Sequence, residues 1–188
     1  NGELIRQTGR GLGDIIIGVP LKKYVNRKGY TYNLSLTPSL RLPTGSIDDD
    51  WAVGDGSWDA GLSLSYSSMT PKWYHLYDLY YWKNGSGRDF DHGDELAFDA
   101  NIGWHAWHDD DDDQGLFLML DIAARHIEKG RHQLVDPAGD TIEVGPVAMY
   151  YEEDWFLKIE YRQTVYDKAK TMSYGDARRF AIGFGLTF

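Results

Sequence analysis

Apolar and polar residues alternate with a period of two along most of this chain. In the segment 30–42, one face carries Tyr and Leu side chains and the other carries Thr, Asn, Ser and Arg side chains, as the two faces of an extended strand can. Helical periodicity is nearly absent, so the chain is predicted to be all-β. The clearest alternating segments are 30–42, 58–67, 95–107, 155–166 and 177–188, and less regular ones are 14–24, 116–127 and 141–151.

The lengths of these segments and of their connections indicate a topology. The segments are longer than typical strands of soluble proteins and are close to the length that a tilted transmembrane strand needs. Short and long connections also alternate, as in a membrane barrel. With Glu3–Thr8 as a short opening strand and 72–83 as an aromatic strand of undecided orientation, ten strands are visible. We therefore predict one domain over 1–188, a closed antiparallel up-and-down transmembrane β-barrel with short turns at 25–29, 70–71, 108–115 and 152–154 and long loops at 43–57, 84–94, 128–140 and 167–176.

The last strand carries large apolar groups on one face and ends the chain on an aromatic residue. This pattern resembles the assembly signal of bacterial outer-membrane barrels, which implies an outer-membrane location and, as partners, the barrel-assembly machinery, lipid and lipopolysaccharide. The alternative is a core strand of a soluble β-sandwich or of a lipocalin-like binder. The residues of the expected signal are Phe180, Ile182, Phe184, Leu186 and Phe188.

Composition agrees with the membrane interpretation. Aromatic residues make up 14% of the chain, with 13 Tyr and 7 Trp, the residues that favour membrane interfaces. A net charge of −10 argues against binding nucleic acid, whose phosphates it would repel. The absence of cysteine excludes disulfides, thiolate metal sites and a cysteine nucleophile.

Three motifs occur in order in the first third of the chain. They are Gly-Leu-Gly-Asp at 11–14, Leu-Pro-Thr-Gly at 42–45 and Gly-Asp-Gly-Ser-Trp-Asp-Ala-Gly at 54–61. Over residues 11–67, and more loosely in the closing strand, the chain resembles the outer-membrane protein family named after the meta-pathway of phenol degradation. The resemblance implies a barrel and uptake of small organic compounds, and it assigns no catalytic residues. In that family further strands usually precede such a block, so twelve strands stay an alternative to ten.

Polar positions of the alternating segments are expected to point into the barrel. They could be paired side chains that fill a narrow interior, or they could line a water-filled path. Small residues of this face are expected to leave open space, whereas Phe156 and Trp107 are expected to narrow it. The small residues are Gly61, Ser63, Ser65, Gly103, Ala181, Gly183 and Gly185. We expect the basic groups on one wall and Asp59 and Asp99 on the opposite one. The expected lumen-lining residues are Arg41, Asp59, Ser63, Asp99, His105, Arg125, Lys158, Glu160, Arg162 and Arg179.

Metal binding and catalysis have weaker support. Asp110, Asp112 and Asp121 match part of a calcium-binding EF-hand pattern, but the residues after 115 alternate as a strand, so a solvated acidic turn is the alternative. No Gly-x-Ser-x-Gly, His-Glu-x-x-His or phosphate-loop motif occurs, and no cofactor motif. We do not expect the protein to be an enzyme. The single constellation resembling a rim site combines His92 and His132 with Asp91, Asp94 and Asp136.

The sequence therefore predicts an outer-membrane barrel that serves as a narrow channel for small organic, including aromatic or hydrophobic, solutes. The alternative function is a barrel without transport, a scaffold or anchor for surface or periplasmic partners. The oligomeric state is open.

Overall fold

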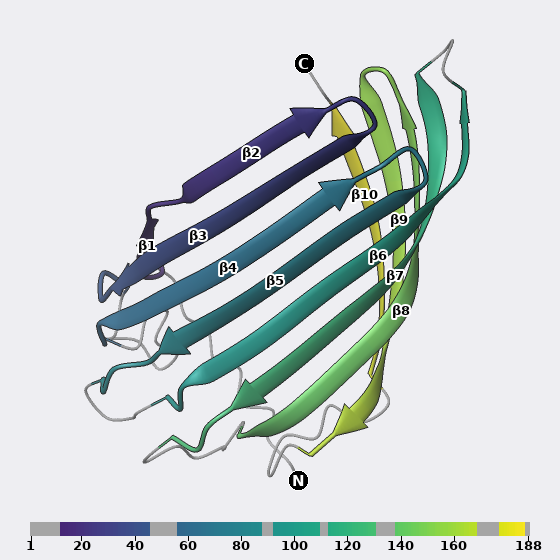
Figure 1. The fold of residues 1–188 in the computed structure, drawn as a ribbon. Helices are drawn as coiled ribbons and strands as arrows, with labels where there is room; N and C mark the ends of the chain where they lie inside the picture. The colour runs from purple at the N-terminus through teal and green to yellow at the C-terminus, as the bar shows by residue number, and fades with distance from the viewer. Residues whose placement is uncertain are drawn as a thin grey trace, which may run out of the picture.

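A computed structural model describes residues 12–45, 56–87, 92–109, 113–130, 138–168 and 177–186. No helix in this part of the chain is long and apolar enough to cross a membrane. Ten β-strands are formed (Figure 1), which confirms the all-β prediction. They are β1 (Ile15–Gly18), β2 (Leu21–Arg27), β3 (Tyr30–Leu42), β4 (Asp59–Met69), β5 (Trp73–Lys83), β6 (Glu95–Asp109), β7 (Gln114–Ile127), β8 (Gly139–Glu152), β9 (Trp155–Asp167) and β10 (Arg178–Leu186).

All ten strands belong to one antiparallel sheet in which neighbours in sequence are neighbours in space from β3 to β10. β1 and β2 both pair with β3 and keep one register, with Ile15 opposite Leu42 and Leu21 opposite Leu36. They therefore form one edge row that is interrupted at residues 19–20. Val19 donates its N–H to the Pro38 carbonyl oxygen, but Pro38 has no N–H to return the bond, which explains the break.

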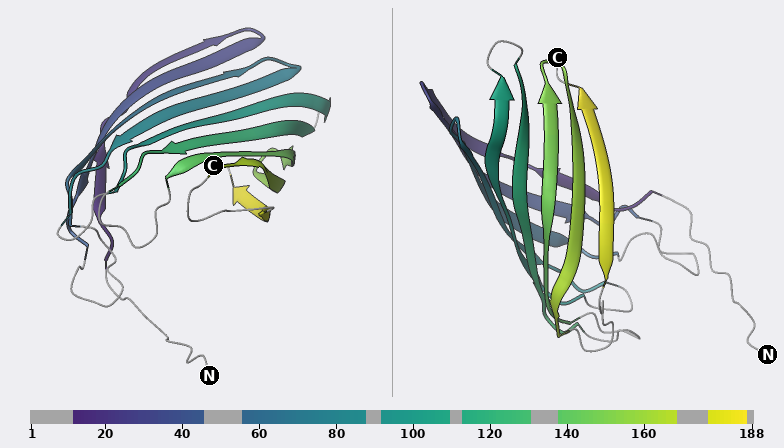
Figure 2. Two further views of the ribbon diagram at one scale, coloured as in Figure 1. Left: turned by 90° about the horizontal axis from the view of Figure 1, so that it is seen from below. Right: turned by 90° about the vertical axis from the view of Figure 1, so that its right-hand side faces the viewer.

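The sheet is strongly curved, but the described residues do not close it (Figures 1 and 2). The β1–β2 row at one edge and β10 at the other each have a single paired neighbour, so the predicted closure is not observed. The up-and-down antiparallel order is confirmed. The expected strand over Glu3–Thr8 and the terminal Phe188 lie outside the described residues.

Tight turns gather at one end of the strands and long connections at the other, as predicted. β2 turns into β3 through residues 28–29, where Gly29 has φ 76°, and β8 turns into β9 through residues 153–154. A positive φ is a conformation that glycine adopts without strain. The connections between β3 and β4, β5 and β6, β7 and β8, and β9 and β10 are the long ones.

The two faces of the sheet are the reverse of those in a soluble protein. Leu36 and Leu62, from the apolar face, have exposed fractions of 40% and 50%. Asp59 and Asp121, from the polar face, are 1% and 5% exposed. The polar face is thus the covered one, and we call it the inward face.

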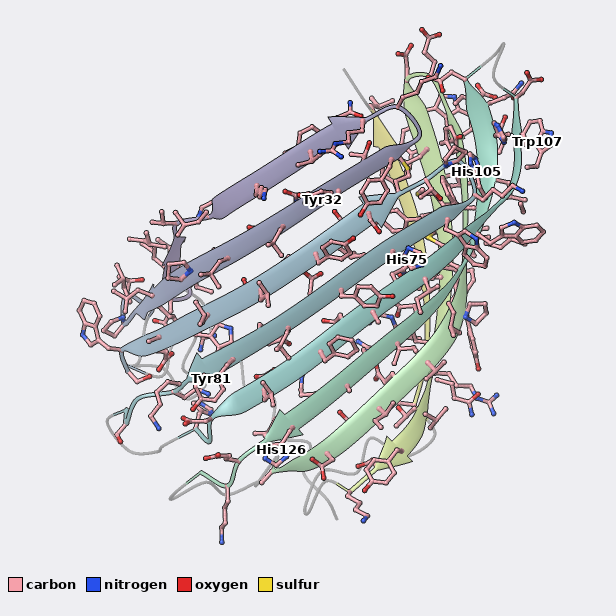
Figure 3. The ribbon with its side chains drawn as sticks, in the orientation of Figure 1. Tyr32, His75, Tyr81, His105, Trp107 and His126 are labelled. Carbon is pink, nitrogen blue, oxygen red and sulfur yellow. The ribbon has the colours of Figure 1, made fainter. Side chains whose placement is uncertain are left out.

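An aromatic belt crosses the outward face from β3 to β6. Tyr32 contacts Tyr66, Tyr66 contacts Tyr77, and Tyr77 contacts Phe98, each with ring centroids 6.4 Å apart. His75 lies 6.2 Å from Tyr77 in the same belt (Figure 3). The belt settles the orientation of β5, which the sequence left undecided: its odd-numbered residues from Trp73 to Tyr81 face outward.

Candidate functional site: the inward face of the sheet

Three cavities lined by described residues lie against the inward face. The first has a volume of about 340 Å³ and is lined from β5 to β10. The second, of about 550 Å³, is lined by β3, β4, β5 and β6. The third, also of about 550 Å³, lies at the turn end between the β2–β3 and β4–β5 turns and strands β6 to β8. All expected lumen-lining residues project from this face: Arg41, Asp59, Ser63, Asp99, His105, Arg125, Lys158, Glu160, Arg162 and Arg179.

The centre of the inward face is a network of ion pairs, which we call the charged region. Arg162 Nε lies 2.5 Å from Asp121 Oδ2 and 2.6 Å from Glu160 Oε1. Lys158 Nζ lies 2.9 Å from Glu160 Oε2. Two further pairs cross from strand to strand, Arg125 with Glu95 at 2.9 Å and Arg179 with Glu143. The network ties β6, β7, β8, β9 and β10 together through side chains.

A second buried carboxylate holds the end of β4 where the long connections begin. Asp59 accepts hydrogen bonds from the Ser57 hydroxyl at 2.6 Å, from the Gly85 N–H at 2.8 Å and from Arg41 at 3.0 Å. The Arg41 guanidinium also lies 4.8 Å from the centre of the Trp82 ring. Asp59 therefore pairs with a base on the neighbouring strand. The expectation that it lies on a wall opposite the basic groups is wrong for Arg41, because β3 and β4 pair with Arg41 directly opposite Asp59.

Apolar and aromatic side chains fill the inward face at the turn end, which we call the aromatic region. Phe117 stacks on His105 with ring centroids 4.1 Å apart and contacts Tyr151 and Tyr74 at 5.8 and 6.2 Å. The Tyr151 hydroxyl lies 2.8 Å from His105 Nε2, and His105 Nδ1 lies 3.1 Å from the Pro71 carbonyl oxygen. Phe117, Met119 and Val147 form its buried centre.

Three glycines of the inward face are covered by neighbouring side chains. A Cβ on Gly61 would lie 2.9 Å from the Trp82 ring, and one on Gly185 would lie 2.3 Å from the Phe156 ring. At Gly103 it would lie 2.7 Å from Met119 Cγ. The expectation that these glycines leave open space is wrong, because large side chains on the paired strands occupy it. Gly183 does have space, since the nearest atom, Lys158 Cβ, is 3.8 Å away.

Trp107 faces outward with an exposed fraction of 46%, so the expectation that it narrows the interior is wrong (Figure 3). The pairing of β6 with β7 shifts between His105 and Trp107, which leaves Ala106 without a partner. A bulge of this kind adds one residue and reverses the alternation beyond it. His105, before the bulge, keeps its inward position opposite Phe117.

A further carboxylate, Asp94, organises the rim beside β5. It accepts hydrogen bonds from Lys83 Nζ at 2.7 Å, from the Tyr81 hydroxyl at 2.6 Å and from the Asn84 N–H at 3.1 Å. Burial would raise the pKa of this carboxyl, but the hydrogen bonds from Lys83, Tyr81 and Asn84 outweigh it and hold the pKa below its usual value. Asp94 thus stabilises the rim through these hydrogen bonds, at the position where the sequence suggested a catalytic site.

The structure shows little of the geometry of the other expected site residues. Asp91, His132 and Asp136 of the rim constellation lie outside the described residues, as do Asp110 and Asp112 of the expected calcium turn. Asp121 lies in the middle of β7 and binds Arg162. In the part of the chain that the structure describes, no group of three or more His, Asp or Glu side chains could hold a metal ion.

Sequence reasoning missed several residues that shape this face. Asp78, Tyr80 and Trp82 of β5 line the second cavity, but the aromatic residues on both faces of that strand hid its alternation. Phe117 and Tyr151 were not expected to pack together. Both stand at inward positions of strands that the sequence did identify, so their alternation with Leu116 and Tyr150 was the available signal.

The fold and this inward face define an all-β protein of up-and-down antiparallel topology. The chain belongs to the family described as "Putative MetA-pathway of phenol degradation", which it matches over residues 1–182. This confirms the resemblance seen in the sequence and extends it to nearly the whole chain. No curated protein and no solved structure matches the chain.

Proposed function

We propose that this chain forms a β-barrel in the bacterial outer membrane and acts as a narrow channel for passive uptake of small organic, including aromatic or hydrophobic, solutes. The family description links its members to phenol degradation, a pathway whose substrates are small aromatic compounds that must enter the cell. The proposal includes no catalytic residue and no cofactor.

The observation that carries the proposal is the reversed polarity of the sheet. In water, exposing rows of Leu and Phe while covering Asp, Ser and Arg would cost free energy on both faces. In a bilayer, the same arrangement places apolar groups against lipid and polar groups in the interior. β10 shows it most clearly, because Phe180, Ile182 and Phe184 are each 65% exposed on one face.

The outward aromatic belt supports the same location. Tyr and Trp gather at the membrane interface, where the ring meets lipid and the polar atom meets water. Tyr30, Trp73 and Trp104 lie on the outward face near the turn end, and Trp58 and Tyr166 lie near the end of the long connections. Lys23 also faces outward, opposite Leu34, and its long chain can carry the ammonium to the interface.

Barrel closure sets one requirement. The ten strands occupy nine rows, because β1 and β2 share one, and successive rows run in opposite directions. The first and last rows therefore run in the same direction, so antiparallel closure takes a further strand between them. The sequence predicts a further strand over Glu3–Thr8, which lies outside the described residues.

The aromatic region favours the second candidate function, a barrel without transport that serves as a scaffold. Phe117, Met119 and Val147 are buried at the turn end, which narrows the interior there. Against a sealed interior stand the cavities of about 340 and 550 Å³ along the charged region and the serine-rich wall of β4.

Single-channel recording decides between the two functions. Folded protein is first identified by its shift in electrophoretic mobility on heating, and then added to a planar lipid bilayer. Reproducible small openings support the channel. Silence from protein that is folded and inserted supports the scaffold.

The lipid-facing assignment has its own test. Ile102→Arg places a charge on the outward face in the middle of β6, where it costs about 2–4 kcal/mol in a bilayer. We expect this variant to fail to assemble in the outer membrane. Ser63→Arg, on the inward face, should assemble, and equal tolerance of both changes would contradict the assignment.

A further inference from the structure

Ten charged groups of the inward face form five ion pairs, and two neighbouring carboxylates of the same face do not. Among the described residues, five basic side chains of this face each have a nitrogen within 3.0 Å of a carboxylate oxygen. The partners are five carboxylates, so these ten groups cancel locally. The pairs are Arg41 with Asp59, Arg125 with Glu95, Lys158 with Glu160, Arg162 with Asp121, and Arg179 with Glu143.

Asp78 and Asp99 are the exceptions. They stand directly opposite each other on β5 and β6, and neither forms an ion pair with a described residue. Like charges directly opposite in a ladder destabilise a sheet. The fold therefore places two carboxylates side by side, without an ion-pair partner for either among the described residues.

The one inward base left without a described acidic partner, Lys22, is too distant to cancel them. Its row runs Lys22, Ser35, Ser65, Asp78, so three strand spacings separate it from Asp78. At the usual spacing of strands this is about 14 Å. That exceeds the screening length of about 8 Å in physiological salt.

Asp99 also lies where two cavities adjoin. It lines the cavity of about 340 Å³ together with Arg125, Arg162 and Arg179, and the cavity of about 550 Å³ together with Asp78, Ser63 and Ser65. The serine hydroxyls carry no charge and can solvate a passing ion. A solute that moves along the inward face between these cavities passes both carboxylates.

We propose that Asp78 and Asp99 make the channel selective for cations, so that cationic and neutral small solutes pass in preference to anions. Carboxylates that line a narrow pore attract cations and repel anions. Arg125 and Arg162 attract Asp99 electrostatically, but each of them already pairs with a carboxylate of its own. The proposal rests on the channel function proposed above.

Reversal potentials in a potassium chloride gradient across a planar bilayer test the proposal. We expect the unmodified protein to pass potassium severalfold more readily than chloride. The double variant Asp78→Asn and Asp99→Asn keeps the shape of both side chains and should bring the ratio close to one. The matched control, Asp154→Asn in the exposed β8–β9 turn, removes one carboxylate elsewhere and should keep the original ratio.

A second variant covers the case in which the double variant does not fold. Ser65→Lys places an ammonium directly beside Asp78 and should also lower the preference for potassium. A preference for chloride in the unmodified protein, or an unchanged ratio in the folded double variant or in Ser65→Lys, overturns the inference and leaves the channel in place. A silent bilayer overturns the channel itself, and the inference with it.

Discussion

The charged region and the aromatic region occupy the same inward face, yet they are held together by different forces. In the charged region, Arg162 bridges Asp121 and Glu160 across β7 and β9. In the aromatic region, Phe117 packs between His105, Tyr151 and Tyr74. Ion pairs respond to salt and to loss of one partner, whereas packed rings respond to volume. One wall thus combines an electrostatic part with a part built like an ordinary protein core.

Removing a ring from the aromatic region should have the largest effect. Phe117 is 6% exposed, and Phe117→Ala should lower the free energy of unfolding by about 3–5 kcal/mol, because it leaves a cavity among packed rings. Urea unfolding in detergent micelles, followed by tryptophan fluorescence, measures this loss, which should not depend on salt. Leu118→Ala, on the outward face, is the control, and an equal loss in both variants would contradict the packing described here.

Breaking the centre of the charged region should cost slightly less. Arg162→Ala leaves Asp121, whose side chain is 7% exposed, as a covered charge without its base, which costs about 3 kcal/mol. The same unfolding experiment should show a loss that changes with salt concentration. Arg178→Ala, an exposed neighbour of Arg179, should cost little, and a salt-independent loss at Arg162 would erase the contrast between the two regions.

Adding a single methyl group should distinguish the tightly packed aromatic region from the charged region. In Gly115→Ala the added Cβ would lie 2.5 Å from His105 Nε2 and 2.7 Å from the Tyr151 hydroxyl oxygen, so we expect a loss of about 1–3 kcal/mol. Gly183→Ala, beside Lys158, meets open space and should be nearly neutral. Thermal unfolding of the two variants checks this, and similar midpoints would show that the aromatic region is not tightly packed.

The smallest effect concerns pH at the rim. The pKa of Asp94 in the folded protein lies below its ordinary value of 3.8, so its ionised form stabilises the fold. This stabilisation is complete above the pKa of the unfolded chain and is lost as the pH falls through the folded-state pKa. Unfolding midpoints between pH 6 and pH 3 should therefore fall more steeply in the unmodified protein than in Asp94→Asn. Parallel pH profiles would contradict the role given to Asp94.

The sequence predicted the strands and their faces more fully than the contacts between them. The segment 30–42 is the strand β3 to the residue, and 155–166 differs from β9 by one residue at its end. Alternation depends on local chemistry, which the sequence displays directly. The partner of Arg162 depends on the register between strands, and register is fixed jointly by turns, bulges and packing.

The failures at Trp107 and at the glycines have the same physical origin. A one-residue bulge at Ala106 cannot be recognised from alternation, since it is itself the interruption of that alternation. Whether Gly61 leaves space depends on Trp82 of the next strand, which no property of Gly61 reveals. The sequence therefore predicted which residues share the inward face, but not how full that face is.

The break in the first row bears on how the free edge behaves toward other chains. Val19 donates its N–H to the Pro38 carbonyl oxygen at 3.0 Å, so the next backbone position, Pro20, is the one turned to the free edge. Proline offers no donor there, and an incoming extended peptide finds a missing bond in the middle of the row. Exposed strand edges are templates for aggregation, and proline is one of the residues that guard them. Pro20 thus disfavours uncontrolled growth of fibrils from this edge for as long as the edge is unpaired.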